Sequence, residues 1–230
     1  IVDPQLTFRF DHDGPPLRLL PGGRIREDDR LRVSYYHGFS INDGQTTVCM
    51  AEPKVYEIWR DQARRMHAAV APPRYVLSMD EIREGGTCQA CRGRNMGQLL
   101  GECLTKQFHM LREVNPKVDV WVWSDMLDPN HNARGNYYLV EGDYTGSWNY
   151  VPKDMGIVCW YYARRALSLP FFSQLGFRTL AGAYYDADTL DNPRGWLEEL
   201  EKTPGAQGIM YTTWQNKYKL LADFGKLVSK

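Results

Sequence analysis

Short apolar runs with the composition of β-strands recur along the chain, and each of them ends abruptly at polar or aromatic residues. They lie within residues 75–81, 119–125, 156–162, 179–186 and 208–215. Between them, apolar residues at helical spacing indicate amphipathic helices over residues 55–70 and 96–114. The pattern therefore predicts strands that alternate with helices.

Strands that alternate with helices are typical of a parallel sheet covered by helices, and polar residues at strand ends are typical of the active face of a (β/α)8 barrel. We count about six convincing strands, the first at residues 31–36, whereas a complete barrel has eight. The sequence thus predicts an α/β domain of the (β/α)8 TIM-barrel type over residues 31–230, with part of the barrel missing. Either the missing strands precede Ile1 or the sheet is open.

Residues 1–30 have a different pattern, in which short β-like runs alternate with turn sequences such as Asp13-Gly-Pro-Pro16 and Pro21-Gly-Gly23. This pattern predicts a small β-hairpin element that is either an insertion or a connection between domains. Because the chain begins with Ile rather than Met, we interpret it as a fragment whose upstream part, with the rest of the barrel, is missing.

Composition limits the choice of partners. The 230 residues are 43% hydrophobic and carry a formal net charge of zero, so neither nucleic acid nor an acidic membrane surface is expected as a partner. No apolar stretch approaches the ~20 residues that span a bilayer. The cellular compartment is not indicated.

The first candidate for chemistry is the acid pair Asp80-Glu81, which directly follows an apolar strand. Carboxylates at the end of a buried strand are costly to desolvate, so they are more often present for chemistry than for packing. The alternative is an ion pair at the strand end between these acids and Arg83 or Arg74.

Aromatic side chains gather at the same strand ends, and together they could form the walls of a cleft. Aromatic rings beside carboxylates and amides suit sugars, whose C–H faces stack on rings while their hydroxyls form hydrogen bonds. The alternative is that these rings are strand formers that fill the core. The set comprises Trp123, Trp160, Tyr161, Tyr162, Tyr184, Tyr185, Tyr211 and Trp214.

The residues at these strand ends, and the order of these short sequences along the chain, resemble the catalytic domain of family 20 glycoside hydrolases, the β-N-acetylhexosaminidases. The resemblance covers the C-terminal two-thirds of the chain and implies that these strands are the fourth to the eighth of the barrel. It rests on Ser78-Met-Asp80-Glu81, Val122-Trp-Ser-Asp-Met126, Cys159-Trp-Tyr-Tyr162, Ala181-Gly-Ala-Tyr184 and Tyr211-Thr-Thr-Trp214.

The resemblance implies removal of terminal N-acetylhexosamine by substrate-assisted, retaining hydrolysis, in which the 2-acetamido oxygen of the sugar is the nucleophile. Glu81 would be the general acid, and Asp80 would orient the acetamido group. This chemistry needs no cofactor.

Further site residues are also implied by the resemblance. Tyr161 or Tyr162 would lie near the acetamido group, Trp123 and Trp160 would be walls, and Trp214 would be a platform beneath the sugar.

The remaining candidates have less distinct roles. Tyr184 belongs to the aromatic set, and Gln215 follows Trp214 where family members often have Gly and a carboxylate. His37 matches an early-strand histidine of the family or forms structural hydrogen bonds. Asp125 either binds a hydroxyl or braces the pocket, and the alternative is that it orders the loop that it begins.

Cys88 and Cys91 form a C-x2-C motif, which is half of a tetrahedral zinc site. They are weak metal candidates, since Cys103 lies on the apolar stripe of a helix and acts as a small hydrophobe. The alternatives are a plain loop pair, reduced or oxidised, and redox chemistry. On this basis no metal site is assigned.

Two function classes remain open. The first is a glycosidase of the hexosaminidase type that acts on a carbohydrate substrate, and the second is a non-catalytic carbohydrate-binding or scaffold relative. A further variant is a glycosidase that uses Glu81 and Asp125 as separated carboxylates. The sugar, the linkage and the oligomeric state are not indicated.

Overall fold

The computed structural model describes residues 21–33, 40–41 and 45–229. The chain divides into two units, Val2–Val48 and Cys49–Lys230. In the first unit, β1 (Ser40–Ile41) pairs antiparallel with β2 (Gln45–Thr46).

Part of the predicted N-terminal structure lies outside the described residues. Within the hairpin element predicted over residues 1–30, residues 21–30 form turns and bends with no strand. Residues 31–33 of the first predicted strand are exposed and have no strand partner. The rest of that strand, residues 34–36, and His37 are among the residues that the structure does not describe.

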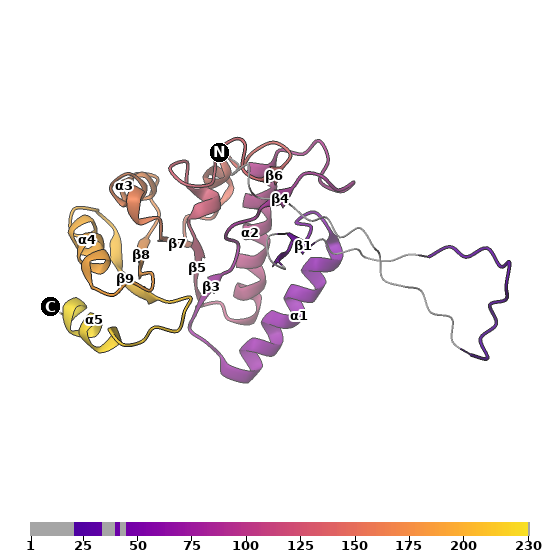
Figure 1. Ribbon diagram of the computed structural model, residues 1–230, viewed down its shortest axis with the longest axis horizontal. Coiled ribbons are helices and arrows are strands. Elements are labelled where there is room, and N and C mark those ends of the chain that lie inside the picture. Colours follow the sequence, from indigo (N-terminus) through magenta and orange to yellow (C-terminus); the bar gives the residue numbers. More distant parts are fainter. Residues whose placement is uncertain (1–20, 34–39, 42–44, 230) are drawn as a thin grey trace. The chain divides into compact units, whose positions relative to one another are not determined.

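The second unit is an α/β fold built on five parallel strands that curl into a half-barrel (Figure 1). The strands follow one another across the sheet in chain order: β3 (Arg74–Leu77), β5 (Asp119–Trp123), β7 (Gly156–Cys159), β8 (Thr179–Tyr184) and β9 (Ala206–Thr212). The alternating parallel architecture predicted from the sequence is therefore confirmed, with five strands in this sheet rather than about six.

Five α-helices in the described part of this unit accompany the sheet, with α1 and α2 beside the β3 end and the others toward the β9 end (Figure 1). They are α1 (Pro53–Val70), α2 (Met96–Val114), α3 (Arg165–Gln174), α4 (Asp191–Leu200) and α5 (Leu221–Val228). None of the helices among the described residues has both the length and the apolarity to cross a membrane.

Local sequence signals explain where the two long helices begin. The Glu52 side chain accepts the backbone N–H of Lys54, and Pro53 occupies the first turn of α1, where its missing N–H costs nothing. At the start of α2, the Asn95 side chain accepts the backbone N–H of Gln98 at 2.8 Å.

The connection from β5 to β7 contains no α-helix. It consists of two 3-10 turns, η1 (Asp125–Leu127) and η2 (Ser147–Tyr150), with the short strand β6 (Leu139–Val140) between them. β6 pairs in parallel with β4 (Glu84–Gly85), which lies in the loop after β3. Hydrogen bonds thus join the long loops that follow β3 and β5.

The core lies between the sheet and the helices. All four residues of β7 are buried, and Trp121 of β5 is fully buried beside them. A Cβ atom at Gly156 would lie 2.2 Å from the Trp121 ring, so only glycine allows the two strands to pack this closely around the indole.

Candidate active site

A pocket of about 350 Å³ lies at the C-terminal ends of the parallel strands. Each strand of the sheet contributes to it, either through its last residue or through the loop that follows. The lining residues are Ser78, Asp80, Glu81, Trp123, Trp160, Tyr185, Thr212, Thr213 and Trp214. The structure therefore brings together both predicted acids and four of the predicted aromatic residues.

A larger hollow of about 650 Å³ lies between α1, α2 and β3. Its lining is mainly apolar, includes Trp59, Met66 and Leu111, and contains no acidic side chain. Such a lining offers no group for acid–base chemistry, so the pocket with Asp80 and Glu81 is the candidate active site.

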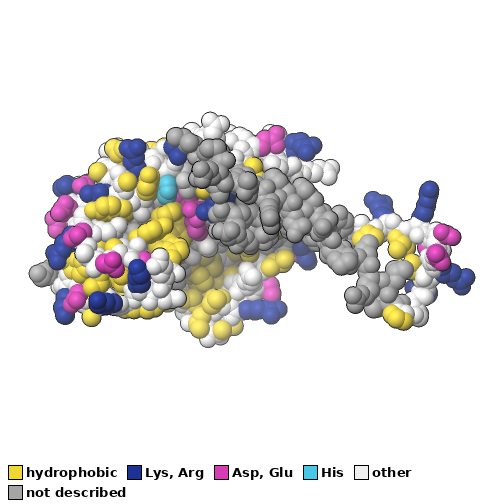
Figure 2. All heavy atoms as spheres, in the orientation of Figure 1, with side chains coloured by type: hydrophobic (Ala, Val, Ile, Leu, Met, Phe, Trp, Pro, Cys, Tyr) yellow, Lys and Arg dark blue, Asp and Glu magenta, His cyan; other side chains and the backbone are white. Residues whose placement is uncertain are grey.

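In the view of Figure 2, the outer surface of the second unit shows no large charged patch that would be an alternative to this pocket as the functional site. Basic and acidic side chains are interspersed over the region of α4 and α5, without a large area of one sign. This mixture agrees with the formal net charge of zero.

Asp80 and Glu81 follow β3 directly but have different surroundings. Asp80 is exposed and accepts a hydrogen bond from the Ser78 hydroxyl at 3.2 Å. Glu81 has a positive φ of 48°, which is unusual for a residue with a side chain, and its carboxylate lies 2.7 Å from Arg83 Nη2. The predicted ion pair at the strand end is therefore present for Glu81 with Arg83, whereas Arg74 pairs with Asp119.

The fully buried Asp125 holds this geometry in place. Its carboxylate accepts the backbone N–H of Glu81 at 2.8 Å, the Asn132 side-chain amide at 2.9 Å and the Trp160 indole N–H at 3.3 Å. Burial raises the pKa of Asp125 to about 7, although these three hydrogen bonds oppose the rise. Because its oxygens face protein donors and it does not line the pocket, Asp125 braces the site.

Three aromatic rings form one wall of the pocket. The Trp160 and Tyr185 rings are parallel, with centroids 6.3 Å apart, and Tyr185 contacts Trp214 at 4.6 Å. Trp214 is 57% exposed, so its ring is available to a ligand. This arrangement suits the apolar face of a sugar.

The Trp123 ring, which also lines the pocket, lies against β8. A Cβ atom at Gly182 would be 2.9 Å from this ring and 3.2 Å from the Trp160 Cβ. Glycine at this position therefore lets two pocket tryptophans pack on the neighbouring strand.

Several other predicted site residues lie outside the pocket lining. Tyr184 is buried and stacks on Tyr211 at 4.2 Å, and Tyr161 stacks on His131 at 4.4 Å. Tyr162 packs on Trp196 at 6.1 Å, and the exposed Gln215 donates its backbone N–H to Asp186 at 3.1 Å.

Asp186 is a site residue that the sequence interpretation missed. Its carboxylate accepts the Thr213 hydroxyl and also the backbone N–H of Trp214 at 2.7 Å, so it holds the loop that carries the Trp214 ring. Burial would raise the pKa of Asp186, but these hydrogen bonds and that from Gln215 lower it overall. The available signal was the carboxylate that ends the strand run 179–186, the same signal that identified Asp80.

Three cysteines form a separate cluster that does not line the pocket. Cys88 and Cys91 lie beside Cys49, whereas Cys103 is buried in α2 outside the cluster. Burial would raise the pKa of Cys88, but hydrogen bonds from the two neighbouring thiols and from the backbone N–H groups of Cys91 and Ala90 lower it overall.

No protein-family model matches this chain, and no curated protein is similar enough in sequence to match it. Its function is therefore argued from the site itself.

Proposed function

We infer that this chain carries the acid-bearing part of a glycosidase that removes terminal N-acetylhexosamine by substrate-assisted, retaining hydrolysis. The observation that supports this most strongly is that Asp80 and Glu81 share a pocket with Trp123, Trp160 and Trp214. In this proposal the five parallel strands are the fourth to the eighth of a (β/α)8 barrel, as the resemblance to family 20 glycoside hydrolases implies.

The size and lining of the pocket support a sugar as the ligand. A volume of about 350 Å³ falls in the range of about 300–1,000 Å³ that small-molecule sites occupy. Indole rings offer faces for C–H groups, and the Thr212, Thr213 and Asp80 oxygens offer partners for hydroxyl or amide groups.

In the proposed reaction, the acetamido carbonyl oxygen of the substrate attacks the anomeric carbon as the glycosidic C–O bond breaks. Glu81 donates its proton to the departing oxygen, and Asp80 accepts the acetamido N–H and stabilises the positive charge of the oxazolinium intermediate. Glu81 then removes a proton from water, which attacks the anomeric carbon and restores the acetamido group.

The position of Glu81 is compatible with this role. Its side chain is 36% exposed, so the carboxyl group is accessible from the pocket, and the bond from its N–H to Asp125 fixes its backbone. Backbone strain of the kind seen at Glu81 is concentrated at functional sites, because the surrounding structure must stabilise it.

One observation favours the second function class, a non-catalytic carbohydrate-binding relative. Arg83 is nearly buried and lies 2.7 Å from the Glu81 carboxylate, a contact that competes with proton donation. The third alternative, with Asp125 as a separate catalytic carboxylate, lacks support because three donors already occupy the buried Asp125 oxygens.

Hydrolysis of an aryl N-acetyl-β-glucosaminide, measured beside the matching aryl β-glucoside, tests the proposal. The assay uses this chain and also a longer polypeptide that contains it, each as wild type and as Glu81→Gln. We expect cleavage of the acetamido substrate alone and, when the aryl group needs a proton to depart, a loss of about 10²–10⁴-fold in Glu81→Gln. Inactivity of both polypeptides, with retained binding of N-acetylglucosamine, would favour the binding relative.

A further inference from the structure

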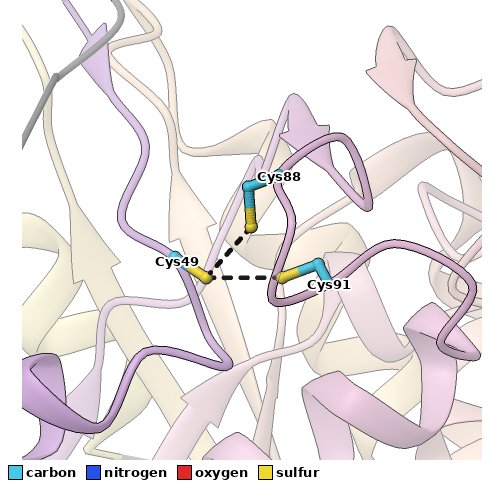
Figure 3. A group of neighbouring side chains, drawn as sticks. All are labelled: Cys49, Cys88 and Cys91. Carbon is cyan, nitrogen blue, oxygen red and sulfur yellow. Dashed lines mark hydrogen bonds between the residues drawn. The ribbon is translucent and has the colours of Figure 1, made fainter.

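The sulfur atoms of Cys49, Cys88 and Cys91 converge on one point (Figure 3). Cys49 Sγ lies 3.4 Å from Cys88 Sγ and 3.4 Å from Cys91 Sγ, and all three sulfurs lie within 4.8 Å of one another. Cys49 comes from the segment before α1, and the other two come from the loop between β4 and α2. The fold thus adds a third sulfur to the C-x2-C motif.

We propose that Cys49, Cys88 and Cys91 bind one zinc ion as a structural site. A tetrahedral zinc ion with Zn–S bonds of about 2.3 Å places its sulfur ligands about 3.8 Å apart, which is close to the separations found here. The described residues bring three protein ligands together, which leaves the fourth position of a tetrahedral ion to water or to a ligand outside those residues. The proposal does not depend on the glycosidase activity.

A disulfide is a poorer explanation of the cluster. It joins two sulfurs at about 2.05 Å and leaves the third without a role. Cys49 is equally close to both other sulfurs, so the arrangement favours neither pair. A metal ion uses all three.

The backbone around the motif forms a tight, hydrogen-bonded turn. The Cys88 carbonyl accepts the N–H of Cys91 at 3.1 Å and that of Arg92 at 2.9 Å, and the Cys91 carbonyl accepts the N–H of Arg94 at 3.0 Å. These bonds hold Cys88 and Cys91 on the same side of a tight turn. Backbone N–H groups that face sulfur, as those of Ala90 and Cys91 face Cys88, stabilise thiolate ligands.

The segment that carries Cys49 is also held in place. The Tyr56 hydroxyl donates to the Met50 carbonyl, and Glu52 donates its N–H to the Cys49 carbonyl at 3.2 Å. Zinc at the cluster would therefore join the start of α1 to the loop that runs from Glu81 to α2. The acid pair would lie at the start of that loop and the metal near its middle.

Metal analysis of the purified chain tests the proposal without any activity assay. We expect about one zinc per chain and, after removal of zinc by a chelator, binding of Co²⁺ with the thiolate-to-cobalt absorption bands of a sulfur-rich tetrahedral site. Cys49→Ser and Cys91→Ser should each weaken Co²⁺ binding by about 100-fold or more. The matched control is Cys103→Ala, which removes a buried thiol outside the cluster and should leave Co²⁺ binding unchanged.

Each contrary result would overturn the proposal. The first such result is a native mass that shows a disulfide within the cluster and no zinc. The second is a site that holds iron with inorganic sulfide in place of zinc. The third is Co²⁺ binding that Cys49→Ser does not change. Because the Co²⁺ titration of the wild-type chain needs no substitution, the proposal can be tested even if a variant fails to fold.

Discussion

Asp125 accepts the backbone N–H of Glu81 at 2.8 Å, and this single hydrogen bond joins the residue after β5 to the acid pair after β3. The partners of the Asp125 carboxylate are all donors: Glu81, Asn132 and Trp160. A buried acceptor surrounded by donors cannot be replaced by an amide without placing two N–H groups against each other.

We therefore expect Asp125→Asn to destabilise the fold by about 1–3 kcal/mol, because at least one buried donor loses its partner. Urea denaturation of the variant and the wild type measures this difference. Asp188→Asn, at an exposed position in the loop after β8, is the matched control and should change stability little. Equal stability of the two variants would show that the contacts of Asp125 contribute nothing.

The raised pKa of Asp125 also predicts a dependence of stability on pH. Burial raises this pKa to about 7 in the folded chain from 3.8. Between these values the folded state binds more protons than the unfolded state, so the free energy of unfolding falls as pH rises through this window.

The contribution of Asp125 is isolated by comparison with Asp125→Asn, whose amide does not titrate. We expect the free energy of unfolding of the wild type to fall more between pH 5 and pH 8, in the window given by the pKa of about 7, than that of the variant. Denaturation curves at both pH values provide the measurement. Parallel changes in the two proteins would rule out titration of Asp125 in this range.

Asp186 is predicted to hold the Trp214 loop, since its carboxylate accepts the Trp214 and Gln215 N–H groups. The same loop contains Lys217, whose side chain donates to the Asp186 carbonyl at 3.0 Å. Asp186→Ala should release the loop and increase the rate of tryptic cleavage at Lys217 about tenfold, because proteolysis follows local opening.

Peptide mass spectrometry over a time course identifies and quantifies that cleavage. Asp188→Ala, two residues further along the chain, serves as the control and should be cut at the wild-type rate. If Asp186→Ala also matched the wild type, hydrogen bonds of Asp186 would not be what orders the loop.

The close packing of Gly182 against Trp123 predicts a cost for any side chain at this position. In Gly182→Ala the new Cβ would meet the ring at 2.9 Å, so Trp123 must move or the strands must separate. We expect a loss of stability of about 1–3 kcal/mol, measured by thermal or urea denaturation, and a weaker affinity for sugar.

Gly225 in α5 provides the opposite case. It has open space at its Cβ position, so Gly225→Ala should stabilise the chain by about 0.5–1 kcal/mol through higher helix propensity. A Gly182→Ala variant as stable as Gly225→Ala would contradict the close packing of Trp123 on β8.

The sequence predicted which strand ends meet but not which side chains at those ends face the pocket. Parallel strands in chain order bring their C-terminal ends to one edge, so Asp80, Trp123 and Trp214 could be grouped from the pattern alone. Tyr184 and Tyr185 could not be distinguished, since both have positive φ and the strand alternation no longer applies to them. The structure buries Tyr184 and directs Tyr185 to the pocket.

The cysteine cluster shows a second limit of prediction from the sequence. The C-x2-C motif is local and visible in the sequence, but Cys49 is 39 residues before Cys88 and belongs to no recognisable ligand spacing. Only the packing of the segment before α1 against the loop after β4 brings it to the motif. The role of Asp125 could not be predicted for the same reason, since its burial depends on the packing of the loop that carries Asn132.

Separate roles for Asp80 and Glu81 predict different responses to the leaving group of the substrate. If Glu81 protonates the departing oxygen, Glu81→Gln should slow a poor leaving group far more than an activated aryl group, which departs without a proton. If Asp80 orients the acetamido group, Asp80→Asn should slow both substrates alike, by about 10²-fold or more, because attack by the acetamido oxygen accompanies the departure of either leaving group. Values of kcat/KM for an activated aryl and an alkyl N-acetyl-β-glucosaminide measure this difference, with Asp188→Asn as the control. An equal loss for both substrates in Glu81→Gln would exclude Glu81 as the proton donor, while activity unaffected by Asp80→Asn would exclude assistance through Asp80.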